Sequence, residues 1–140
     1  PSAMVLLDLE DAAEQAANRS WMRASDVIDA VAAHCESDPM WAMRMLLQGR
    51  DQSLALSTPA RRAIWATGTP RQPLTGPWKT LAYTLLRESA RDGRPIPRWL
   101  AAPLPLREPW APIPLRQGRP LDDGLAKLGI EINERELVTA

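Results

Sequence analysis

The feature that most constrains this chain is a dense run of prolines in its second half. Eight of the 14 prolines lie there, namely Pro95, Pro97, Pro103, Pro105, Pro109, Pro112, Pro114 and Pro120. Proline fixes φ and has no backbone N–H, so this density excludes both a long helix and a central strand. Residues 95–120, the proline-rich strap, are therefore predicted to be extended and partly polyproline II. We expect the strap to pack along the rest of the protein through its large apolar residues, Trp99, Leu104, Leu106, Trp110 and Ile113.

Before the strap, apolar residues recur at helical spacing in five segments. The expected helices cover residues 5–21, 25–38, 40–48, 59–68 and 77–93. The third has the clearest start, because Asp38 can cap it and Pro39 suits the first helical position. Residues 40–48 leave almost no polar face, so we expect this helix to be central and buried and to end at Gly49.

The other helix boundaries follow from caps, prolines and glycines. Ser25 is the expected N-cap of the second helix. Thr58 followed by Pro59 repeats the cap-then-proline signal of the third, and Pro77 opens the fifth helix, which Gly93 closes. A brief helix is expected from Pro97 to about residue 102.

Beyond the strap, residues 121–128 are predicted to form a last short helix. Ile130 and Ile132 alternate with Glu131 as in a very short strand, but a helix from Asn133 is equally compatible with the sequence. The predicted fold is an irregular all-α bundle of five to six short helices with an extended proline-rich segment and a small C-terminal element.

Length and composition are those of a globular domain. The chain has 140 residues, of which 45% are hydrophobic and 24% charged, enough to bury a core. We expect a single domain over residues 1–140, with a helical body at 1–94, the strap at 95–120 and a short C-terminal element at 121–140.

The formal net charge of zero hides a segregation of charge along the chain. Residues 1–43 carry a net charge of −6, residues 44–119 carry +9 and residues 120–140 carry −3. Within the basic part, one series is regularly spaced: Lys79, Tyr83, Arg87 and Arg91 fall at successive i+4 positions, and Arg94 and Arg98 extend the series. We call these six residues the basic stripe, because i+4 neighbours share one helix face.

Three interpretations of the basic stripe are open. It can be a solvated helix face, it can be neutralised by the acidic segment around Asp8 and Glu14, or it can bind phosphate or an acidic protein. Arginine favours the last, because its guanidinium makes bidentate contacts to carboxylates and phosphates. The stripe residues are therefore the candidate partner-binding site.

No residue set for catalysis or for a cofactor is visible. His34 and Cys35 are the only histidine and the only cysteine, and adjacent helix positions point about 100° apart, which argues against metal binding and against a Cys–His pair. The seven glycines are scattered, so no phosphate-binding loop is indicated. We expect no enzyme activity, no cofactor and no metal.

The function predicted from these features is that of a non-enzymatic binding module that docks on a protein partner. Arginine outnumbers lysine 15 to 2, which is typical of GC-rich bacterial genomes, so a small bacterial accessory or regulatory protein is expected. No stretch approaches 18 apolar residues and no signal sequence is evident, which predicts a cytoplasmic protein without a membrane partner. The alternative is a nucleic-acid-binding protein that uses the basic stripe together with exposed indoles, the candidates being Trp65, Trp78, Trp99 and Trp110.

Overall fold

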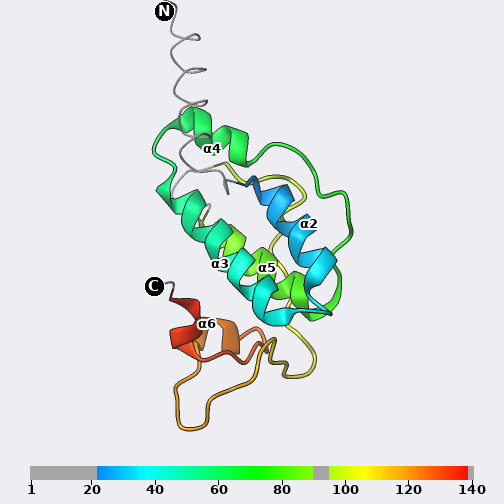
Figure 1. The fold of residues 1–140 in the computed structure, drawn as a ribbon, viewed down its shortest axis with the longest axis vertical. Helices are drawn as coiled ribbons and strands as arrows, with labels where there is room; N and C mark the ends of the chain where they lie inside the picture. Colours follow the sequence, from blue (N-terminus) through cyan, green and yellow to red (C-terminus); the bar gives the residue numbers. More distant parts are fainter. Residues whose placement is uncertain (1–21, 90–94, 139–140) are drawn as a thin grey trace, which may run out of the picture.

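The computed structural model describes residues 22–89 and 95–138, and their fold is mostly α-helical (Figure 1). Five α-helices and one 3₁₀-helix occur in these residues: α2 (Ala24–His34), α3 (Pro39–Ala55), α4 (Pro59–Trp65), α5 (Gly76–Ser89), α6 (Asp123–Ala126) and the 3₁₀-helix (Glu134–Leu137). The helix expected over residues 5–21 and the end expected at Gly93 lie outside the described residues.

Helix α3 occupies the centre, as predicted. It packs on α2 on one side and on α5 on another (Figure 1), and its residues Ala42, Met43 and Leu46 are buried. Its start is also as predicted, because Asp38 Oδ1 accepts a hydrogen bond of 3.1 Å from the backbone N–H of Trp41. This bond satisfies one of the N–H groups that a helix leaves unpaired at its first turn.

The prediction that α3 ends at Gly49 is wrong, because the helix continues to Ala55. Gly49 is buried where α3 crosses α2, and a Cβ atom placed on it would lie 2.5 Å from Cγ2 of Val27. The glycine therefore permits close approach of two helices and does not terminate one. The expectation that residues 40–48 are buried with almost no polar face is also wrong, since Arg44 and Gln48 are exposed on α3.

The remaining helix starts differ in how well they were predicted. Thr58 caps α4 by accepting a 3.2 Å hydrogen bond from the N–H of Arg61, and α5 begins one residue before Pro77. Ser25, however, is buried inside α2; the N-cap is Arg23, whose backbone N–H donates to Asp26 Oδ2 at 3.1 Å.

The proline-rich strap forms neither a helix nor a regular strand, as predicted. A single turn, closed by a 3.0 Å hydrogen bond from Leu100 N to Pro97 O, replaces the brief helix expected there. Four of the five apolar residues expected to pack do so: Ile113 is buried, and Trp99, Leu106 and Trp110 pack half-buried against the core. Leu104 does not, because 83% of its surface is exposed.

The C-terminal element combines both of the forms that the sequence left open. Isolated bridges pair Trp110 with Ile130 and Leu121 with Asn133, and the 3₁₀-helix follows at once. The buried Asn133 side chain accepts a 2.8 Å hydrogen bond from Arg116 N and donates one of 3.2 Å to Arg119 O. Asn133 thereby fixes the last part of the strap against the C-terminal element.

In the described part of the chain, none of the helices combines the length and the apolar character that crossing a membrane requires.

The contact at Gly49 gives a direct test of the α2–α3 packing. We expect Gly49→Ala to lower the free energy of unfolding by about 1–3 kcal/mol, because the added methyl group overlaps Val27 in a packed core. This loss should exceed the gain of about 0.5–1 kcal/mol that alanine brings to an ordinary helix interior. Urea titration followed by tryptophan fluorescence measures it.

The matched control is Gly124→Ala in α6, where the new Cβ would meet only Asp122 Oδ2 at 3.5 Å. We expect no loss of stability in that variant. Adding Val27→Ala to Gly49→Ala should relieve the overlap. Wild-type stability of Gly49→Ala alone would contradict the helix crossing described above.

Candidate partner-binding groove

The basic stripe is not a uniformly exposed face. Lys79 is exposed on the first turn of α5, but Tyr83 is buried and Arg87 is half-buried. Arg98 is exposed on the strap. Arg91 and Arg94 lie outside the described residues.

Arg87 serves as an anchor for the strap. Its Nη1 donates a 2.7 Å hydrogen bond to the backbone carbonyl of Leu100, whose side chain is buried. A charged donor on a buried carbonyl makes a strong hydrogen bond, and the carbonyl would be left unpaired without it. The guanidinium is therefore engaged within the protein.

A second hydrogen bond holds the same part of the strap. The indole Nε1 of Trp99 donates to the carbonyl of Gly68 at 2.9 Å, which ties the strap to the loop that follows α4. The Trp99 ring also packs edge-on against Tyr83, with ring centroids 5.7 Å apart and an interplanar angle of 69°. Edge-to-face packing of this kind is the favoured arrangement of aromatic pairs.

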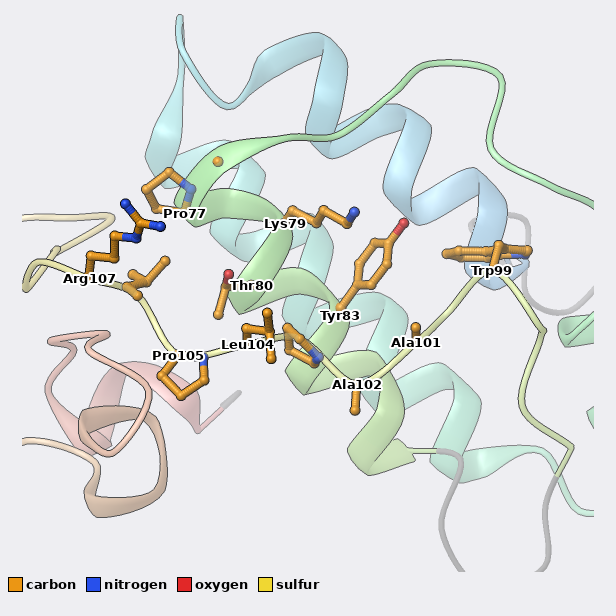
Figure 2. Close-up of a pocket in the computed structure, with 13 residues that line it drawn as sticks. Pro77, Lys79, Thr80, Tyr83, Trp99, Ala101, Ala102, Leu104, Pro105 and Arg107 are labelled. Atoms are coloured by element: carbon orange, nitrogen blue, oxygen red, sulfur yellow. The ribbon is translucent and has the colours of Figure 1, made fainter.

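These contacts leave a groove between the strap and α5, which we call the α5–strap groove. Figure 2 shows the strap passing along α5 from Trp99, near Tyr83, to Arg107, near Pro77. The groove has a volume of about 480 Å³, within the range of ligand-binding clefts. Its walls are mainly apolar, built from prolines and alanines of the strap and from the aromatic pair.

The charge in the α5–strap groove is of one sign. Lys79 contributes its ammonium from α5, with Nζ 5.3 Å from the centre of the Tyr83 ring, and Arg107 contributes an exposed guanidinium from the strap. Among the described residues that line the groove, none is acidic. The exposed Leu104 lies on the strap side of the groove (Figure 2). The groove thus offers cations and apolar surface together.

Of the six stripe residues, the structure brings Lys79 and Tyr83 into this groove. Arg87 instead lines a neighbouring hollow with Thr84 and Leu128. Sequence reasoning did not single out Arg107 or Leu104 as site residues, because their placement depends on the path of the strap. The only indication of this placement in the sequence was the predicted packing of the strap along the helical body.

The four tryptophans considered for stacking on bases are largely engaged. Trp65 and Trp78 are buried in the core, and Trp110 packs edge-on against Trp78 with ring centroids 5.4 Å apart. Trp99 is the one that lines the α5–strap groove.

Residues 22–89 and 95–138 give no support for metal binding or for thiol chemistry. No group of three or more His, Cys, Asp or Glu side chains in these residues could hold a metal ion. Cys35 is buried, and burial followed by the nearby Glu36 carboxylate raises the pKa of its thiol, which disfavours the reactive thiolate. His34 is exposed and packs against the Trp41 ring, with ring centroids 4.4 Å apart.

No family model matches the sequence, and comparisons with curated proteins and with solved structures gave no match either.

The two arginines of the stripe that the structure describes should differ sharply on substitution. We expect Arg87→Met to lower the free energy of unfolding by about 1–3 kcal/mol, since it removes the charged hydrogen bond to the Leu100 carbonyl and keeps an apolar stem. The control Arg98→Met, at an exposed position, should stay within about 0.5 kcal/mol of wild type. Equal effects of the two substitutions in urea titrations would contradict the anchoring role of Arg87.

Tyr83 is the only tyrosine in the chain, so its ionisation can be read without interference. Burial raises the pKa of its hydroxyl, because the apolar surroundings disfavour the charged tyrosinate. We expect the ultraviolet titration midpoint of the folded protein to lie above the usual value of about 10 and to return to it in urea. Since the folded pKa is the higher one, the stability linked to Tyr83 is present below the unfolded pKa and is lost as pH rises further. Identical midpoints in the two states would contradict the burial of Tyr83.

Proposed function

We propose that this chain is a non-enzymatic binding module, a small bacterial accessory or regulatory protein of the cytoplasm that docks on a protein partner. The docking site is the α5–strap groove, and its occupant is an extended segment of the partner that carries acidic and aliphatic side chains. The observation that carries the proposal is the composition of the groove, whose described lining residues include two cations and apolar walls but no acidic side chain.

The charges of the groove determine which charge the partner segment must carry. An acidic side chain entering the groove meets Lys79 on one wall and Arg107 on the other, and it meets no like charge among the described lining residues. Complementary charge of this kind speeds association and disfavours partner segments that carry positive charge. Arg98, exposed next to Trp99, extends the same positive charge beyond the groove.

The apolar surface of the groove recognises the aliphatic side chains of the partner segment. Trp99 and Tyr83 form a rigid aromatic wall, held in place by the hydrogen bond to Gly68 and by edge-to-face packing. Aromatic anchors in preformed clefts supply much of the affinity at protein interfaces, because little side-chain entropy is lost on binding. The exposed Leu104 gives an aliphatic side chain of the partner a surface to cover.

Nucleic acid is the alternative partner, and the structure supports it less. Binding of single strands without sequence preference relies on aromatic faces that stack on successive bases. Two of the four candidate indoles are buried, and a third, Trp110, packs against one of them. The phosphate attraction of Lys79 and Arg107 would remain, so the experiment below includes a nucleic acid.

The test selects peptides from a displayed random library on the wild-type protein and then measures their affinity by fluorescence anisotropy. We expect the selected peptides to be rich in Asp or Glu next to Leu, Ile or Val. The double variant Lys79→Glu/Arg107→Glu should lose affinity by about tenfold or more, because repulsion replaces attraction at both walls.

The matched control is Arg119→Glu/Lys127→Glu, which changes the net charge equally at exposed positions that do not line the groove. This control should keep the wild-type affinity. Peptides that bind both double variants equally well would refute the site. A labelled single-stranded DNA is titrated in parallel at low and moderate salt. Salt-sensitive DNA binding that only Lys79→Glu/Arg107→Glu abolishes, without peptide binding, would establish nucleic acid as the partner instead.

A further inference from the structure

A stretch of the chain's own sequence has the composition that the α5–strap groove is proposed to recognise. Residues 5–11, which we call the 5–11 segment, comprise four aliphatic and three acidic side chains and no basic one. They lie outside the described residues. Residues 130–137 also combine aliphatic and acidic side chains, but Ile130 and Ile132 are buried in the C-terminal element. The 5–11 segment is therefore the better match to the groove.

The described residues begin close to the Trp99 end of the groove. Gly68 connects the two places. Its carbonyl accepts the 2.9 Å hydrogen bond from the Trp99 indole, and a Cβ atom placed on Gly68 would lie 3.2 Å from Oγ of Ser25 in α2. Met22, three residues before Ser25, packs half-buried against the core. The 5–11 segment is thus tethered near one end of the groove.

The tether is long enough for the 5–11 segment to lie along the groove. Residues 12–21 join the segment to Met22, and ten residues of extended chain span up to about 33–36 Å. The groove runs beside the strap from Trp99 to Arg107, and eight steps of extended chain cover at most about 29 Å. The tether therefore allows the acidic side chains of the segment to reach both cations of the groove.

We propose that the 5–11 segment occupies the α5–strap groove of its own chain and competes there with the partner, an inference that rests on the proposed function of the groove. Its carboxylates pair with Lys79 and Arg107, which line the groove without an acidic neighbour among the described lining residues. Its leucines cover the apolar wall that includes the exposed Leu104. The docking site is then regulated by the chain itself, because a partner must displace the 5–11 segment before it binds.

A tethered segment does not need high affinity to act in this way. A short flexible tether gives an effective concentration of about 1 mM. If the free segment binds with a dissociation constant of about 0.1 mM, the groove is filled about 90% of the time and the apparent affinity of a partner falls about tenfold. Helix ends open at little cost, so the helix expected over residues 5–21 does not prevent this contact.

The test compares the wild-type full chain with Asp8→Lys/Asp11→Lys, in which repulsion from the groove replaces attraction. The control Glu36→Lys/Glu134→Lys changes the net charge equally at exposed positions that do not line the groove. The probe is a fluorescent peptide with the sequence of residues 4–14, titrated by anisotropy. We expect it to bind Asp8→Lys/Asp11→Lys about tenfold more tightly than the wild type or the control, because the groove is open only in that variant.

Two further chains define the site and guard against misfolding. Adding Lys79→Glu/Arg107→Glu to Asp8→Lys/Asp11→Lys should abolish binding of the probe, since both cations of the groove are then reversed. If urea titration shows that Asp8→Lys/Asp11→Lys is unfolded, Asp8→Asn/Asp11→Asn replaces it and should also bind the probe more tightly than the wild type does.

Equal affinity of the probe for all three chains, an equal gain in the control, or no binding to any chain would overturn the proposal. The peptides selected from the library separate its failure from that of the proposed function. If they bind the wild type and Asp8→Lys/Asp11→Lys equally well, the groove remains a docking site and only its occupation by the 5–11 segment is refuted. If no acidic peptide binds either chain, both proposals fail. A gain that grows with protein concentration would assign the segment to a second copy and overturn the contact within one chain.

Discussion

The anchoring of the proline-rich strap beside α5 is the interaction on which the rest of the candidate site depends. Prolines supply no backbone N–H, so the strap cannot stabilise its own path by regular hydrogen bonding. Bonds to other parts of the protein hold it: Arg87 donates to the Leu100 carbonyl, Trp99 of the strap donates to the Gly68 carbonyl, and Leu106 N donates to the Leu128 carbonyl at 2.8 Å. The first two bonds hold the Trp99 end of the second wall of the α5–strap groove and the third holds its Leu106 end, so together they determine where that wall lies.

The positive residues of the molecule consequently have different roles. Arg87 stabilises the strap within the protein, whereas Lys79 and Arg107 present charge to the groove. Arg44 belongs to neither group and lies on the outer face of α3. The basic residues of the middle of the chain are thus divided between an internal anchor and a groove for an acidic segment. The second of these roles is a proposal.

Local signals in the sequence predicted the starts of α3 and α4 correctly, because capping is a short-range interaction. Asp38 and Thr58 cap the helices that they were expected to cap. Features that depend on distant segments were not predictable in this way. A glycine in an apolar run suggests a helix end, and only the position of Val27 on α2 shows that Gly49 is a packing contact. Likewise, i+4 spacing places Tyr83 and Arg87 on one face, but the strap decides that this face is partly covered.

The central claim is that an acidic segment binds between α5 and the strap. It is tested most directly by titrating the ¹⁵N-labelled protein with an acidic, aliphatic peptide and following the amide and indole resonances. The account predicts that the largest shifts occur at Lys79, at the Trp99 indole N–H and at the amides of Ala101, Ala102, Leu104, Leu106 and Arg107, with little change on α2. Shifts confined to other surfaces, with the Trp99 indole unaffected, would contradict it.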